Sequence, residues 1–241
     1  MIKAIIFDLD GTLVQTEILK AHSYASALSL LSGNSVSEEE VVQNFKNYVG
    51  LSRADVAKNM VQDYWEQLKH ISNQKVETVN LLIEKRLENY NRMLETPNVL
   101  QKYFCKNTIG FLKEVKQDNF LTGLATMSNR IQVKNVLQIM GIQDHFNFVI
   151  TRDEITNSKP HPEIYLQMKN KLKVEADECV VIEDSVTGVK AALSAKMNVF
   201  VVTNSITKES VRKSKLLDKK FIIEDPAELR TRVYEFIENP K

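Results

Sequence analysis

The chain has 241 residues, enough for one large α/β domain or for such a domain with a smaller second one. Hydrophobic residues make up 43% and charged residues 26% of the sequence, which is typical of a globular protein. The 32 basic and 31 acidic side chains leave a net charge of +1, so the charge gives no indication of a nucleic-acid partner.

The cysteines and the apolar stretches bear on the location of the protein. Cys105 and Cys179 are too few and too far apart in sequence for a disulfide framework, which favours a reducing, cytoplasmic setting. The first apolar stretch ends at Asp8, too early for a signal peptide, and no later stretch approaches the length of a membrane span. We therefore expect a soluble cytoplasmic protein without a membrane partner, with a monomer as the default.

The N-terminal third of the chain changes character after its first residues. Residues 2–7 form a mostly apolar run that is typical of a strand buried on both faces of a parallel sheet, and residues 8–12 follow as a polar turn. From about residue 17 to residue 95, apolar residues recur at helical spacing, and no convincing strand is present. This stretch predicts a small helical bundle, and Pro97 marks its end.

Beyond Pro97, short apolar runs alternate with helix-like segments. The runs are 120–125, 148–150, 180–182, 199–202 and 221–223, and the segments lie near 106–117, 130–140, 161–172, 186–196, 207–217 and 227–237. Such alternation predicts βαβ units in a doubly wound parallel sheet. The first strand completes the same sheet, which makes the helical block an insertion. The predicted fold is α/β, with a core domain of residues 1–15 and 97–241 and an inserted helical domain of residues 16–96.

In open α/β sheets, ligands bind at the carboxyl ends of the strands, so the polar residues directly after the apolar runs are the candidates for chemistry. These residues are Asp8, Asp10 and Thr12 after the first run, Thr126, Ser128 and Asn129 after the second, Lys159 beyond the third, and Glu183 and Asp184 after the fourth. Because the carboxyl ends of parallel strands meet at one edge of the sheet, we expect these side chains to converge there.

Carboxylates dominate this edge. Asp8, Asp10, Glu183 and Asp184 would repel one another, and a hard divalent cation removes that repulsion. Mg²⁺ prefers oxygen ligands and is commonly held by one or two carboxylates together with a phosphate. Lys159 adds a positive charge for another phosphate oxygen. The edge therefore predicts a Mg²⁺ site for phosphoryl transfer.

Neutral groups at the same edge are suited to an anion. The backbone amides of the turn around Gly11 and Thr12 can cradle one, and Gly11 permits the turn itself. Thr126, Ser128 and Asn129 supply neutral donors. Ser128 and Asn129 are equally good helix caps, so both the structural and the substrate-binding interpretation stand.

The order of the first two carboxylates suggests a division of labour. A carboxylate can attack phosphorus and form an aspartyl-phosphate, which divides one difficult step into two easier ones. Asp8 stands directly at the strand end and is the candidate nucleophile. Asp10, two residues on, can donate a proton to the leaving group and then withdraw one from the attacking water.

The run Phe7-Asp8-Leu9-Asp10-Gly11-Thr12-Leu13 resembles the first motif of the haloacid dehalogenase-like superfamily. Thr126, Lys159 and the pair Glu183-Asp184 are similar to its second, third and fourth motifs, in the family's order. The helical block at about 16–96 resembles the family's cap domain. The resemblance covers essentially the whole chain and implies a Rossmann-like core with a mobile helical cap that closes over the substrate.

The resemblance also implies roles for individual residues. Asp8 is the nucleophile and Asp10 the acid/base, and an aspartate at the latter position points to phosphoryl transfer instead of dehalogenation. Mg²⁺ is held by Asp8, the backbone carbonyl of Asp10 and Asp184. Glu183 lies close to the ion or acts on it through water.

One segment of the helical block is similar to a substrate-recognition stretch of the β-phosphoglucomutase-like branch. This segment, Val49-Gly50-Leu51-Ser52-Arg53, makes Arg53 the candidate for gripping a distal phosphate or hydroxyl, although a solvated salt bridge is a competing interpretation. Lys20 stands where the mutase pattern has a histidine, and Val49 where it has a lysine. Both departures count against a mutase. Lys20 remains a candidate substrate contact, with a surface role as the favoured alternative.

The sequence thus predicts a Mg²⁺-dependent phosphatase that hydrolyses a small phosphorylated metabolite, such as a sugar phosphate, through an aspartyl-phosphate on Asp8. One alternative is a β-phosphoglucomutase-like mutase, which must exclude water and hold two phosphate positions. Another is a phosphate-responsive binding module of the receiver type, against which the large insertion argues. The chain contains neither GxxxxGK[ST] nor GxGxxG, so neither a P-loop nor a dinucleotide-binding enzyme is expected.

Overall fold

The computed structural model describes residues 1–48 and 51–239, and the chain divides into two compact units. Met1–Gln15 and Phe104–Lys241 form one, which we call the core unit. Thr16–Tyr103 form the other, which we call the helical unit.

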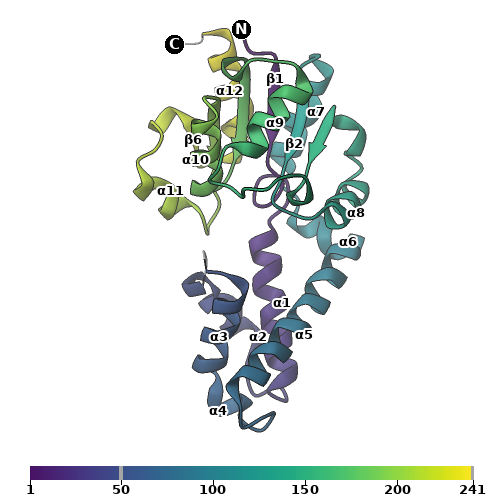
Figure 1. Cartoon of the computed structure of the whole chain (residues 1–241), viewed down its shortest axis with the longest axis vertical. Helices are drawn as coiled ribbons and strands as arrows, with labels where there is room; N and C mark the ends of the chain where they lie inside the picture. Colours follow the sequence, from purple (N-terminus) through teal and green to yellow (C-terminus); the bar gives the residue numbers. More distant parts are fainter. Residues whose placement is uncertain (49–50, 240–241) are drawn as a thin grey trace. The chain divides into compact units, whose positions relative to one another are not determined.

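Among the described residues, the core unit contains a six-stranded parallel sheet in the order β3-β2-β1-β4-β5-β6. Figure 1 labels β1, β2 and β6 of this sheet. The strands are β1 (Ala4–Phe7), β2 (Leu121–Ala125), β3 (Phe148–Ile150), β4 (Cys179–Glu183), β5 (Asn198–Val202) and β6 (Ile222–Ile223). All four residues of β1 are buried because β1 is central, paired with β2 and β4. The strand order reverses at this point, so the doubly wound sheet predicted from the sequence is confirmed.

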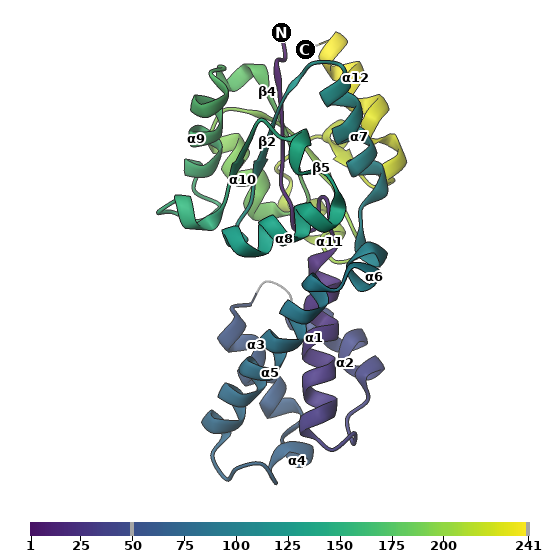
Figure 2. The same ribbon diagram turned by 90° about the vertical axis from the view of Figure 1, so that its right-hand side faces the viewer.

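Helices cover both faces of the sheet (Figure 2). The helices of the core unit are α7 (Lys106–Gln117), α8 (Arg130–Met140), α9 (Glu163–Leu172), α10 (Val186–Ser194), α11 (Lys208–Ser214) and α12 (Leu229–Glu238). Side chains of α9, α10 and α11 share one apolar cluster with Ala4 and Ile6 of β1. The alternate residue Phe7 faces the other way, where its ring lies 6.0 Å from that of Phe111 on α7. This alternation is what buries β1 from both sides.

The helical unit is a bundle around its own apolar core. Its helices are α1 (Thr16–Leu31), α2 (Glu38–Asn44), α3 (Arg53–Asp63), α4 (Trp65–Leu68), α5 (Lys75–Glu95) and α6 (Pro97–Leu100). Helix α1 packs on α2 and α5, and α3 packs on α5. None of the described helices combines the length and the apolar character that a bilayer crossing requires.

The two chain segments that lead into and out of the helical unit are tied together inside the core unit. The backbone amide of Cys105 donates to the carbonyl of Leu13 over 2.9 Å, and β1 and β2, which flank the insertion in sequence, pair in the sheet. The sequence composition changes at Pro97, but the second junction between the two units lies further on, between Tyr103 and Phe104. The helical unit continues past Pro97 because this proline begins α6, which packs on α5.

We expect the central strand to dominate the stability of the core unit. Ile6 is fully buried, and Ile6→Ala should lower the free energy of unfolding by about 2–5 kcal/mol because it leaves a cavity in a packed interior. Ile131→Ala is the matched control, since Ile131 is 76% exposed and its replacement should change stability by less than about 0.5 kcal/mol. Urea unfolding followed by circular dichroism measures both variants, and equal shifts would contradict the expected packing.

Candidate active site

The side chains that follow β1, β2 and β4 meet at the carboxyl edge of the sheet, beside the reversal of strand order. Asp8 follows β1, and its backbone amide continues the ladder by donating to the carbonyl of Ile182 on β4 at 2.9 Å. Lys159 reaches the same place from the loop between β3 and α9. The convergence expected from the sequence is therefore present for these elements.

Lys159 is buried between two carboxylates. Its Nζ donates to Oδ1 of Asp8 at 2.7 Å, to Oε1 of Glu183 at 2.7 Å and to the carbonyl oxygen of Ala125 at 3.0 Å. Its side chain is only 5% exposed. Burial by itself would lower the pKa of Lys159, but the carboxylates of Asp8 and Glu183 raise it well above the ordinary value. The ammonium group therefore stays charged, and an ordinary surface role for Lys159 is ruled out.

Negative charge at the site exceeds the charge of this single lysine. Burial raises the pKa of Asp8 to about 8, with Glu183 and Asp10 acting in the same direction and Lys159 in opposition. One carboxylate oxygen from each of Asp8, Glu183 and Asp184 lies within 4.8 Å of the others, and all three residues are buried. These buried carboxylate oxygens are only partly neutralised by Lys159. They fit a hard divalent cation such as Mg²⁺, which prefers oxygen ligands.

Asp10 turns away from that group toward β2. Its Oδ2 accepts hydrogen bonds from Oγ1 of Thr126 at 3.2 Å and from Oγ of Ser128 at 2.7 Å. Thr126 Oγ1 in turn accepts the backbone amide of Ser128 at 3.1 Å. The Asp10 carboxylate is therefore oriented by hydroxyl donors, and the described acidic cluster does not include it.

Ser128 and Asn129 have different hydrogen-bond partners in the structure. Ser128 points to Asp10 at the site. Asn129 is the N-cap of α8, and its side chain accepts the amide of Gln132 at 3.0 Å. Thr12 is fully buried, and its Oγ1 has no hydrogen-bond partner among the described residues.

Gly11 gives the Asp184 carboxylate its space. A Cβ atom at Gly11 would lie 2.0 Å from Oδ2 of Asp184, and the glycine has a φ of +84°. On its other side, Oδ2 of Asp184 accepts a hydrogen bond from Nδ2 of Asn204 at 3.2 Å. Gly11 therefore serves the site through both its backbone conformation and its missing side chain.

Sequence reasoning missed two residues of the site. Asn204 closely follows β5, so the rule of inspecting the residues after each apolar run would have found it had we applied it to the run 199–202. Tyr165 donates to Oε1 of Glu183 at 2.6 Å from within α9. Nothing in the sequence distinguishes Tyr165 from the apolar residues that line the inner face of that helix.

Of the candidate substrate contacts of the helical unit, Lys20 has a side-chain partner, whereas the contact described for Arg53 is made by its backbone. Lys20 forms an ion pair with Glu17 on α1. Arg53 begins α3, and its carbonyl accepts a hydrogen bond from the hydroxyl of Tyr24 at 3.3 Å. Val49 and Gly50, which belong to the proposed recognition stretch, lie outside the described residues.

A further arginine of the helical unit was not singled out from the sequence. Arg86 on α5 is buried, and its guanidinium carbon lies 4.5 Å from the ring centroid of Tyr90 and 5.1 Å from that of Tyr24. Burial lowers the pKa of Arg86. Within the described part of the chain, its Nε has no hydrogen-bond partner.

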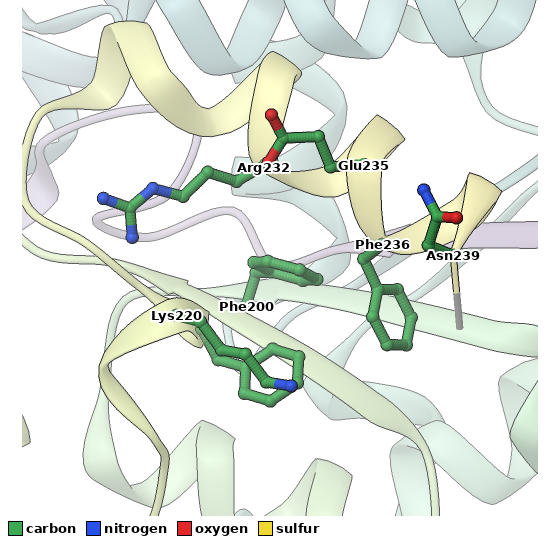
Figure 3. Close-up of a pocket in the computed structure, with 7 residues that line it drawn as sticks. Phe200, Lys220, Arg232, Glu235, Phe236 and Asn239 are labelled. Carbon is green, nitrogen blue, oxygen red and sulfur yellow. The ribbon is translucent and has the colours of Figure 1, made fainter. Parts of the chain in front are cut away.

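Two of the cavities of the core unit are of interest, and neither is lined by the carboxylate cluster. One, of about 570 Å³, includes Gly11 and Asn204 in its lining and so borders the site. The other, of about 280 Å³, lies between β5 and α12, and its lining includes Phe200, Phe221 and Phe236 together with Lys220 and Arg232. Figure 3 shows the Phe200 and Phe236 rings of this cavity, with the Arg232 side chain extending away from them. The three phenylalanine rings pack edge to face at centroid distances of 5.1 to 5.7 Å, which is typical of an aromatic core contact.

The chain was compared with protein families and with proteins of known function. A family model described as haloacid dehalogenase-like hydrolase matches residues 5–202. The chain is similar to hexitol phosphatase B of Escherichia coli (strain K12), with 29% identity over 202 residues and 83% of each protein covered. It is also similar to the phosphorylated carbohydrates phosphatase of Thermotoga maritima, with 26% identity over 197 residues, covering 80% of this chain and 81% of that protein.

Among solved structures, a β-phosphoglucomutase from Clostridium difficile has the same fold. The TM-score is 0.65 at 24% sequence identity, and the match covers 99% of this chain and 100% of that one.

Gly11→Ala should disturb the acidic cluster specifically. The new methyl group would collide with Asp184, so we expect a loss of at least about tenfold in Mg²⁺ affinity, in addition to backbone strain of about 1–3 kcal/mol. Gly141→Ala is the matched control, because Gly141 has a φ of +64° but nothing within 4 Å of the added atom. Calorimetric titration with Mg²⁺ measures both variants. Equal affinities in the two variants would show that Gly11 does not make room for an ion ligand.

Proposed function

Because the chain belongs to the haloacid dehalogenase-like hydrolase family, we propose that it is a Mg²⁺-dependent phosphatase acting through an aspartyl-phosphate on Asp8. The observation that carries the proposal is the placement of Asp8, a buried carboxylate at the end of the central strand, in contact with Lys159. The relatives named above as phosphatases of hexitols and of phosphorylated carbohydrates support a small sugar phosphate or a similar phosphomonoester as the substrate.

In the first proposed step, a carboxylate oxygen of Asp8 attacks the phosphorus in line, and the bond between phosphorus and the leaving oxygen breaks. Oδ2 of Asp10 is occupied by Thr126 and Ser128, which leaves Oδ1 to carry the proton that the leaving oxygen takes up. The fixed charge of Lys159 offsets the negative charge that accumulates beside Asp8.

In the second proposed step, water attacks the phosphorus of the aspartyl-phosphate. Asp10 accepts the proton of that water, and the bond between phosphorus and Asp8 breaks to release phosphate. Both proton transfers use one side chain, whose orientation the hydroxyls of Thr126 and Ser128 maintain.

Asp8 and Asp184 are the residues that would hold Mg²⁺, together with the backbone carbonyl of Asp10 that the family pattern implies. When bound, the ion supplies positive charge to phosphoryl oxygens and relieves the repulsion among the buried carboxylates. We keep Arg53 and Lys20 of the helical unit as candidate substrate contacts.

A panel of phosphomonoesters that includes both anomers of glucose 1-phosphate tests this function by ³¹P NMR. We expect free phosphate to appear only with Mg²⁺, and Asp8→Asn to reduce the rate by at least about 10³-fold because the nucleophile is lost. Asp153→Asn is the control, since Asp153 lies on the 3-10 helix Arg152–Glu154 and its carboxylate accepts the backbone amide of Arg130, away from the Asp8 carboxylate cluster.

The position of the phosphorus in the product decides between the two enzyme classes. Release of inorganic phosphate supports a phosphatase. Relocation of the phosphoryl group on the sugar would instead establish a mutase, and full activity of Asp8→Asn would contradict the proposed nucleophile.

A further inference from the structure

Both oxygens of the Glu183 carboxylate are occupied by donors. Oε1 accepts hydrogen bonds from Nζ of Lys159 at 2.7 Å and from the hydroxyl of Tyr165 at 2.6 Å. Oε2 accepts the backbone amide of Asp184 and the hydroxyl of Ser185, each at 3.1 Å. A carboxylate held at both ends cannot rotate away from Lys159 without breaking several of these bonds.

The backbone of α10 fits closely around this carboxylate. A Cβ atom at Gly188 would lie 1.9 Å from Oε1 of Glu183, so the absence of a side chain there is what admits the group. Ser185 is the N-cap of α10 and binds the amide of Gly188 at 3.1 Å while it also donates to Glu183. The helix end therefore fixes Oε2, whereas among the described residues the donors to Oε1 are Lys159 and Tyr165.

Tyr165 is fully buried on α9 and approaches the lysine as well as the glutamate. Nζ of Lys159 lies 5.0 Å from the centroid of its ring, within the range of a cation–π contact. Burial and the Glu183 carboxylate raise the pKa of Tyr165 well above its ordinary value, so the hydroxyl keeps its proton and remains a donor. One side chain thus packs beside the lysine and donates to the lysine's partner.

We propose that Tyr165 is a positioning residue for the reaction: its hydroxyl fixes Oε1 of Glu183, and Glu183 in turn holds Lys159 against Asp8. This inference rests on the proposed function, because the lysine must be directed at the nucleophile for its position to matter. The hydroxyl's described contact is with Glu183, so its loss should reduce kcat and leave KM nearly unchanged.

A double-mutant cycle tests the pathway from Tyr165 through Glu183. The variants are Tyr165→Phe, Glu183→Gln and the double substitution, assayed with p-nitrophenyl phosphate and Mg²⁺. We expect Tyr165→Phe to lower kcat about tenfold with KM within about twofold, since one hydrogen bond to a charged acceptor is lost. In the Glu183→Gln background the same change should cost less than about twofold.

Tyr234→Phe is the matched control. It also removes a tyrosine hydroxyl that donates to a carboxylate, that of Asp118, which precedes β2 and so lies at the opposite edge of the sheet. We expect its kcat to equal that of the unmodified protein. An unchanged kcat for Tyr165→Phe, or additive losses in the cycle, would overturn the proposal.

Urea unfolding of the same variants in excess chelator supplies a readout that is independent of turnover. We expect Tyr165→Phe to lower the free energy of unfolding of the metal-free protein. The same substitution should lower it less when Glu183 has already been replaced by Gln. If the unmodified protein hydrolyses no phosphomonoester, the proposed function fails, and an unfolding cycle that shows coupling still supports the contact between Tyr165 and Glu183. Absence of coupling in unfolding would overturn the positioning role by itself.

Discussion

The contact on which the site depends is the buried ammonium group of Lys159 between the carboxylates of Asp8 and Glu183. It joins three segments that are far apart in sequence and buries charges that are tolerated only as long as they remain paired. Removing Lys159 would leave the buried carboxylates of Asp8 and Glu183 without their cation, and the loss of one partner of a buried pair costs about 3–5 kcal/mol in comparable cases. The same pairing directs a fixed positive charge at the carboxylate that we propose as the nucleophile.

The parallel sheet is what makes this contact possible. Strands β1 and β4 are neighbours and run in the same direction, so Asp8 and Glu183 leave the sheet side by side. The helical unit is inserted directly after the first motif. The backbone hydrogen bond from Cys105 to Leu13 joins the chain segments before and after this insertion within the core unit. Gly11 and Gly188 then leave room for the carboxylates of Asp184 and Glu183, respectively. The fold thus supplies position, and the two glycines supply space.

Much of the core unit could be predicted because its periodicity is strong. The segments predicted at 106–117 and 130–140 coincide with α7 and α8, and residues at the carboxyl ends of β1, β2 and β4 lie together in the candidate site. The end of the helical unit was predicted at Pro97 because prolines often follow helices, but a proline is also common in the first turn of a helix, and Pro97 begins α6. Tyr165 could not be found, because a buried tyrosine that packs on apolar neighbours has the same helical spacing as a leucine. Its function depends on a partner 18 residues away along the chain, which only the tertiary structure identifies.

We propose that the phosphoryl group is transferred to Asp8 before water releases it. Trapping this aspartyl-phosphate is the most direct test. The protein would be mixed with the best phosphomonoester and Mg²⁺, quenched in acid during turnover and digested for peptide mass spectrometry. We expect phosphate on the peptide that contains Asp8, and none on that peptide in the Asp8→Asn variant. Phosphate on another residue, or continued turnover by Asp8→Asn with no phosphorylated peptide, would contradict the claim.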